Sequence, residues 1–180
     1  MVYLALGIRC LIGAVFLASS VGKTAGRGAF DRFVSSLEGM RVVPSRSARS
    51  VARWVVAAEA TVCATLATPL PEAAIAGFVL AAALLAAFTA GIALTLRRGM
   101  RTPCRCFGTS AGPLGPRHLV RNLALAALAV TGAFAVSAGG ATAPGGAVLA
   151  ALTGLLLGGL VAVLDDILDL FRTSRIPANP

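Results

Sequence analysis

Five long apolar stretches constrain this chain more than any other feature of its sequence. The hydrocarbon core of a bilayer is about 30 Å thick, and a helix crosses it with roughly 20 mostly apolar residues. The stretches that meet or approach this length are Val2–Val21, Ala52–Ala67, Ala73–Leu96, Leu119–Ala138 and Ala147–Leu164. Open sheets cannot stand in lipid, and the alternating pattern of barrel strands is missing. The sequence therefore predicts an all-α integral membrane bundle with four or five spanning helices.

Composition supports this interpretation and excludes several other classes of protein. Hydrophobic residues make up 57% of the 180 residues and charged residues 13%, whereas a soluble domain carries about 25% charged residues. A cytosolic enzyme, a disordered chain and a coiled coil are excluded. The net charge of +9 does not indicate a nucleic-acid partner, because the basic residues lie between the apolar stretches. The expected environment is the lipid bilayer.

The first and last apolar stretches each raise a local question. The first could be a signal peptide, but it lacks a basic start, Arg9 interrupts it, and no large hydrophilic segment follows. We expect it to remain as a membrane helix. In the last stretch, Gly154 and Gly158 form a small-xxx-small pair. Such a pair favours close helix packing, although high overall use of Ala and Gly would also produce it.

The distribution of basic residues predicts the orientation in the membrane. The connections around residues 68–72 and 139–146 contain no Lys or Arg. The other two connections carry Lys23, Arg27, Arg32, Arg41, Arg46, Arg49 and Arg53, and then Arg97, Arg98, Arg101, Arg105 and Arg117. Basic loops stay in the cytoplasm. We therefore expect a multi-pass protein of the cytoplasmic (inner) membrane with its N-terminus outside and the loop of residues 97–118 inside.

The pair Cys104 and Cys106 is the strongest candidate for chemistry. The two thiols are separated by one residue and flanked by Arg101 and Arg105, and nearby positive charge stabilises the reactive thiolate. A disulfide between such close neighbours closes a small, strained ring that is easily reduced. We expect a redox pair. Metal binding with the single histidine, His118, is one alternative, but three ligands fall short of a closed zinc site. Two idle thiols are the other, and no metal or other cofactor is expected.

Two further cysteines and one carboxylate lie inside the apolar stretches. Cys10 and Cys63 fall at similar depths in the predicted orientation, so they form either a second pair or relay, or two small apolar side chains. Glu59 lies deep in the second stretch, where a charge is costly, so it needs a buried partner or a proton. It serves either a structural hydrogen bond or proton handling. The candidate partners are Arg9, Ser19, Ser20, and Arg121 with Asn122.

Several of these segments together resemble a known family. The end of the first stretch from Phe16 to Lys23, the basic loop to Pro44, and Glu59 are similar to the DoxX-like membrane proteins. The run Cys104-Arg105-Cys106-Phe107-Gly108, followed by Leu119-Val120-Arg121-Asn122, resembles the methylamine utilisation protein MauE family. This resemblance implies a four-helix membrane domain over residues 1–138. Residues 139–180 would add a further transmembrane helix and a short cytoplasmic tail.

The resemblance also implies a function. It implies that the protein acts with a thioredoxin-like partner in maturing a client, the disulfide-rich small subunit of methylamine dehydrogenase. That maturation takes place outside the cytoplasmic membrane, whereas the basic residues place Cys104 and Cys106 inside. Electrons would then have to cross the membrane, through Cys63 and Cys10, or the loop serves another purpose.

Three functions are consistent with the sequence. The first is a membrane thiol–disulfide relay centred on Cys104 and Cys106, the only enzymatic activity the sequence suggests. The second is a non-catalytic scaffold or chaperone that holds a maturation complex together. The third is a small transporter or a quinone-binding subunit built around Glu59, because carboxylates at that depth often mark ion or substrate pathways.

Overall fold

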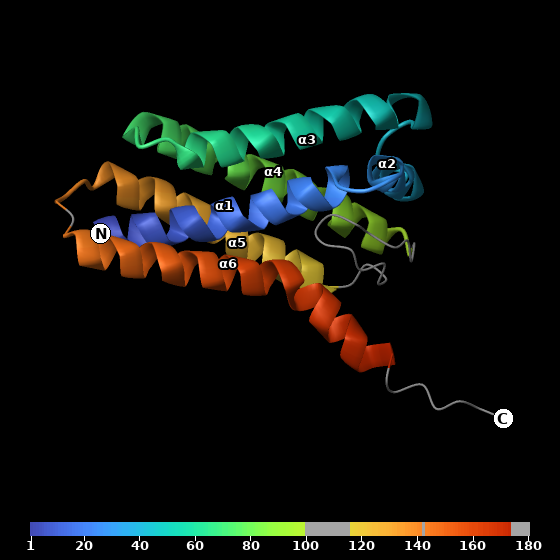
Figure 1. The fold of residues 1–180 in the computed structure, drawn as a ribbon. Helices are drawn as coiled ribbons and strands as arrows, with labels where there is room; N and C mark the ends of the chain where they lie inside the picture. Colours follow the sequence, from blue (N-terminus) through green and yellow to red (C-terminus); the bar gives the residue numbers. More distant parts are fainter. Residues whose placement is uncertain (100–115, 142, 174–180) are drawn as a thin grey trace.

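The chain folds into a bundle in which every regular element of the described residues is a helix. The structure is a computed structural model, and it describes residues 1–99, 116–141 and 143–173, with side chains up to residue 164. The helices are α1 (Val2–Thr24), α2 (Ala29–Gly39), α3 (Ser45–Ala67), α4 (Pro71–Arg97), α5 (Pro116–Ser137) and α6 (Pro144–Thr173) (Figure 1). Five of them, all except α2, are long and apolar enough to cross a membrane. The predicted all-α membrane bundle is confirmed.

The second span and the first connection differ from the sequence-based expectation. α3 begins at Ser45 rather than Ala52, so this helix has 23 residues and is long enough to span. The added turns, residues 45–51, bring Ala48 into the core in line with Ala52 of the predicted stretch, while Arg53 is exposed. Because these turns are polar in sequence, the pattern of apolar residues did not indicate that they belong to the helix.

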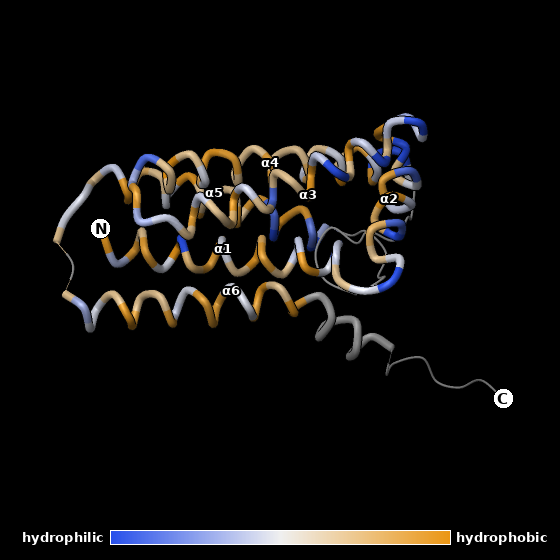
Figure 2. Tube along the Cα trace, turned by 45° about the horizontal axis from the view of Figure 1, so that its top comes forward, coloured by the Kyte–Doolittle hydropathy of each residue, from blue (hydrophilic) through white to orange (hydrophobic). Residues whose placement is uncertain are grey.

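Helix α2 was expected as part of a loop. Gly28, with φ 74°, precedes it in the left-handed region that glycine adopts without strain. Its buried residues Ala29, Phe33 and Leu37 recur every four positions and form one apolar face. Because its other face is polar, α2 lies across one end of the bundle instead of spanning it (Figure 2).

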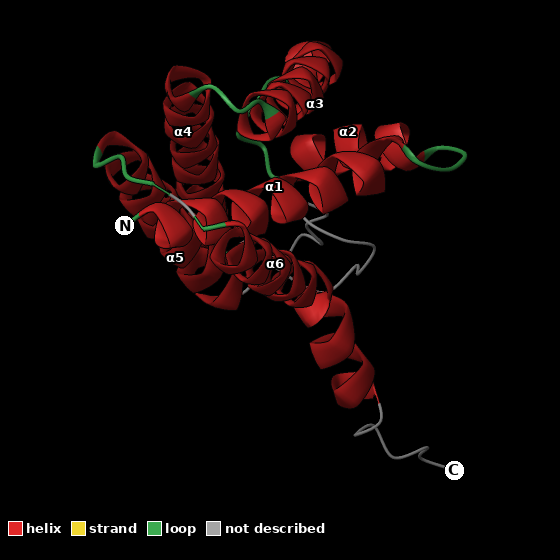
Figure 3. Ribbon diagram, turned by 60° about the vertical axis from the view of Figure 1, so that its left-hand side comes forward, coloured by secondary structure: helices red, strands yellow, loops and turns green. Residues whose placement is uncertain are grey.

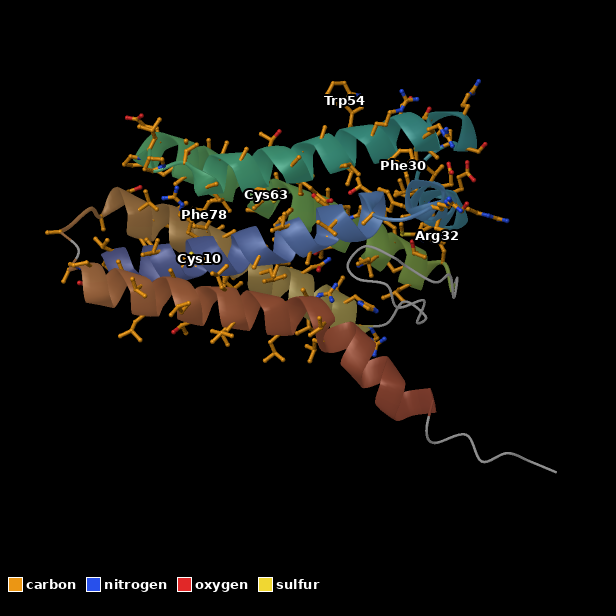
Figure 4. All side chains as sticks on the ribbon, in the orientation of Figure 1. Cys10, Phe30, Arg32, Trp54, Cys63 and Phe78 are labelled. Atoms are coloured by element: carbon orange, nitrogen blue, oxygen red, sulfur yellow. The ribbon has the colours of Figure 1, made fainter. Side chains whose placement is uncertain are left out.

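Helix α1 is the centre of the bundle. It packs against all five other helices, whereas α6 packs on α1 alone within the described residues. Figure 3 shows α6 lying alongside α1. Ile12 and Phe16 of α1 are fully buried with Val62, Phe78 and Leu85 from neighbouring helices. The outward side chains are also apolar, as with Leu156 on α6, and Trp54 projects away from the bundle (Figure 4). An apolar exterior over an apolar core is what a lipid-exposed bundle requires.

The close contact predicted for the glycine pair of α6 is confirmed. A Cβ added to Gly154 would overlap the carbonyl oxygen of Gly7. A Cβ added to Gly158 would lie 2.6 Å from the carbonyl oxygen of Leu11. The order of these contacts shows that α1 and α6 run in the same direction, backbone against backbone.

The helix order separates two chemically different ends of the bundle. We call the end that carries α2 the basic end. There α1 and α4 finish, at Thr24 and Arg97, and α3 and α5 begin, at Ser45 and Pro116 (Figure 1). The hydrophilic colours gather at this end (Figure 2). The opposite end holds the N-terminus and the start of α6.

Candidate functional site

Glu59 lies in the apolar part of α3, and its side chain is completely buried. The ammonium of Lys23, in the last turn of α1, is 2.6 Å from Oε1 of Glu59, and Lys23 is itself only 2% exposed. The side chain of Lys23 therefore points into the bundle, although the sequence had placed it among the basic loop residues. A buried carboxylate is tolerated when a hydrogen-bonded cation compensates it, and Lys23 meets that condition.

Two serines complete the surroundings of this ion pair. Lys23 Nζ also donates to Ser19 Oγ at 2.5 Å, and Ser19 Oγ in turn donates to Glu59 Oε1 at 3.0 Å. Ser20 Oγ donates to Glu59 Oε2 at 3.4 Å. Both carboxylate oxygens thus accept hydrogen bonds. We refer to Ser19, Ser20, Lys23 and Glu59 as the Glu59 cluster.

Aromatic rings close the cluster toward the basic end. Lys23 Nζ lies 5.0 Å from the ring centroid of Phe33 on α2 and 5.7 Å from that of Phe88 on α4. Ammonium groups are attracted to aromatic faces at these distances. The cluster and these two rings therefore connect four helices, α1 to α4, next to the basic end.

The other partners suggested for Glu59 lie elsewhere. The guanidinium Nε of Arg9 donates to the backbone carbonyl of Leu66, near the end of α3. Among the described residues, the carboxylate of Glu59 bonds to Lys23 and the two serines and not to Arg121. Asn122 is completely buried with no hydrogen-bond partner among the described residues. Of the sequence-based candidates, the structure brings Ser19 and Ser20 to Glu59.

Asn122 nevertheless lies at the depth of the Glu59 cluster. A Cβ on Gly132 of α5 would meet Ile8 of α1 at 3.0 Å and Phe78 of α4 at 2.6 Å. Because α5 runs antiparallel to both helices, ten residues back along α5 correspond to ten residues forward along α1 and α4. Asn122 is then level with Phe88 and with the turn that carries Ser19.

The two cysteines within spans lie at similar depths but against different neighbours. Cys63 Sγ on α3 approaches the carbonyl oxygen of Gly13 on α1 at 4.0 Å. Cys10 lies one turn before Gly13, and its Cβ is 3.0 Å from the position of a Cβ on Gly154 of α6. Both thiols are free and partly buried (Figure 4). Cys63 thus packs on α1, and Cys10 packs on α6.

Cys104 and Cys106 lie outside the described residues, but the helix ends on either side are described. The connecting segment leaves α4 at Arg97 and enters α5 at Pro116, both at the basic end. Arg98 is fixed there, because its Nη1 donates to the carbonyl of Arg41 at 3.0 Å. In the first turn of α5, His118 is 8% exposed. Within the described part of the chain no group of three His, Cys, Asp or Glu could hold a metal.

Comparison with known proteins gives the family. Residues 1–135 match the family described as methylamine utilisation protein MauE. The chain belongs to this family. The methylamine utilization protein MauE of Paracoccus denitrificans is 32% identical to it, over 86% of this chain and 87% of that protein. No solved structure matches the chain significantly.

The MauE region contains both candidate sites. The matched range, residues 1–135, includes the Glu59 cluster and the positions of Cys104 and Cys106. It ends near the end of α5, so α6 lies beyond it. As a MauE-family protein with five candidate spans, this is a multi-pass membrane protein.

Proposed function

We propose that this MauE-family protein is a thiol–disulfide redox component of the cytoplasmic membrane that supports maturation of a partner protein in methylamine utilisation. The observation that carries the proposal is the position of Cys104 and Cys106 in the MauE region, on the segment between two helix ends at the basic end. The similarity to the methylamine utilization protein MauE of Paracoccus denitrificans supports the pathway. The client by family resemblance is the small subunit of methylamine dehydrogenase.

The proposed chemistry needs only the two thiols and a partner disulfide. One thiolate, favoured by Arg101 and Arg105, attacks a sulfur of the partner disulfide and forms a mixed disulfide. The second thiol of the pair then displaces the partner. The pair becomes a Cys104–Cys106 disulfide, and the partner disulfide, a thioredoxin-like one by family resemblance, becomes a dithiol. Two electrons and two protons pass to the partner in the net reaction, and the reverse reaction regenerates the pair.

The positions of Cys10 and Cys63 bear on a route across the membrane. Cys10 is 14 residues from Thr24, which corresponds to about 21 Å along α1. Thiol–disulfide exchange requires contact between sulfur atoms. Under our proposal, exchange therefore takes place at the basic end, and any passage of electrons through Cys10 and Cys63 depends on a separate carrier.

The Glu59 cluster has a positioning role in this proposal. Phe88, whose ring lies near the Lys23 ammonium, is nine residues before the end of α4 at Arg97. The cluster thus fixes the helix that leads into the cysteine segment. Because Lys23 compensates the charge of Glu59, the geometry supports this role over ion transport.

The proposal predicts that a Cys104→Ser/Cys106→Ser variant loses function while still accumulating in the membrane. The matched control is Cys10→Ser/Cys63→Ser, which removes the same number of thiols from the spans and should retain function. Growth on methylamine of a host lacking its own copy is the assay, with membrane immunoblots to check the amount of protein. Full growth with the loop variant would favour the non-catalytic scaffold instead.

A further inference from the structure

Arg9 is an intramembrane cation without a counter-ion in the described structure. It lies at the start of the third turn of α1, in the half of the bundle opposite the basic end, and is partly buried. No ion pair of the described residues involves it; Glu72, in the first turn of α4, is not paired with it. A charged side chain in a spanning helix is costly, and such residues usually mark a binding site or pathway.

Only one of the N–H groups of Arg9 has an acceptor within the described residues. Nε donates to the carbonyl of Leu66, the next-to-last residue of α3. This bond caps α3, because the last four carbonyls of a helix have no partner within it. A guanidinium carries five N–H donors. The four donors on Nη1 and Nη2 have no acceptor among the described residues. Neither nitrogen is fully buried. They are therefore open to a ligand.

The open side of Arg9 belongs to a pocket of about 400 Å³. Its walls are formed by α1, the turn between α3 and α4, the end of α5 with the residues that follow it, and Ala147 in the first turn of α6. Among the described residues that line it, Arg9 is the one with a charge, and the others are apolar, such as Val2, Leu6, Pro69, Pro71 and Val136. A single guanidinium in an apolar pocket matches an amphiphile that has one oxyanion and a hydrocarbon part.

We propose that this pocket binds a phosphate oxyanion through the two Nη groups of Arg9, supplied by a phospholipid of the leaflet at that end. A guanidinium recognises phosphate with two parallel hydrogen bonds. The depth agrees with this ligand, because Arg9 bonds to Leu66 one residue before α3 ends, so its side chain reaches toward the headgroup region. The apolar walls favour a lipid over free inorganic phosphate, which offers the same oxyanion without a hydrocarbon chain.

The test measures lipid affinity of the purified, delipidated full chain. Phosphatidylglycerol is titrated into wild type and Arg9→Gln, and bound lipid is counted by native mass spectrometry. The wild type should hold one tightly bound lipid, and Arg9→Gln should bind it about tenfold or more weakly, as expected for the loss of a charged hydrogen-bond pair. Arg53→Gln, an exposed arginine at the basic end, should change this affinity less than about twofold.

A second variant separates binding from folding. Ala147→Leu fills the pocket from α6 but leaves the bond between Arg9 and Leu66 intact, so it should also weaken the lipid without unfolding the protein. Titration with inorganic phosphate identifies the source. Inorganic phosphate that binds at least as tightly as the lipid, with this binding lost in Arg9→Gln, would assign the site to the free ion. Equal lipid affinity in wild type, Arg9→Gln and Ala147→Leu would overturn the proposal.

Discussion

Replacing Lys23 with methionine should destabilise the protein by about 3–5 kcal/mol, because Glu59 is then left as a buried charge without compensation. Reversible unfolding in mixed detergent micelles measures the change. The exposed pair Arg49–Asp31, with side chains 61% and 64% exposed, is the matched control. Arg49→Met should cost no more than about 1 kcal/mol, because exposed ion pairs contribute little.

The double variant Lys23→Met/Glu59→Leu distinguishes a buried ion pair from two independent side chains. Replacing a whole buried pair with apolar residues is often neutral, so the double variant should recover most of the stability lost by Lys23→Met. If instead the two single costs simply add, Lys23 and Glu59 do not act as a pair and the cluster has been misassigned.

Replacing Gly154 with alanine should separate α6 from α1. The added methyl group would overlap the backbone oxygen of Gly7, which no rotamer change can relieve, so we expect a loss of about 1–3 kcal/mol. Gly159 is the control on the same helix, since a Cβ there meets nothing within 4 Å. Gly159→Ala should instead stabilise by up to about 1 kcal/mol through helix propensity. Equal effects at both positions would mean that the contact between α1 and α6 is absent.

Much of the fold could be predicted from sequence because lipid imposes one strong rule. A span must be a long apolar helix, and this rule found the five spanning helices. It also explains the two differences. The first turns of α3 and all of α2 are not continuous apolar runs, and their buried residues recur periodically among polar ones. In α2 that pattern is Ala29, Phe33 and Leu37.

Glu59 and the two serines of the Glu59 cluster were predicted from the sequence, but Lys23 was not. Glu59 was recognised because a carboxylate in an apolar run is conspicuous, and the serines were among the named partners. Lys23 was missed because lysine at the end of a span normally turns outward to the interface. One signal was available: Ile12, Phe16, Ser19 and Lys23 are spaced by four, three and four residues, which places Lys23 on the buried face of α1. Which helix lies opposite that face depends on tertiary packing.

The side of the membrane on which Cys104 and Cys106 lie tests the proposed function most directly. An impermeant maleimide is applied to intact cells and to opened membranes, in a variant whose two span cysteines are replaced by alanine. In a second variant, the loop cysteines are replaced as well and Ala141→Cys introduces a single thiol. This thiol marks the opposite end, since Ala141 is exposed between α5 and α6. We predict that the thiol introduced by Ala141→Cys reacts in intact cells, while Cys104 and Cys106 react only after the membrane is opened. Labelling of Cys104 or Cys106 in intact cells would contradict it.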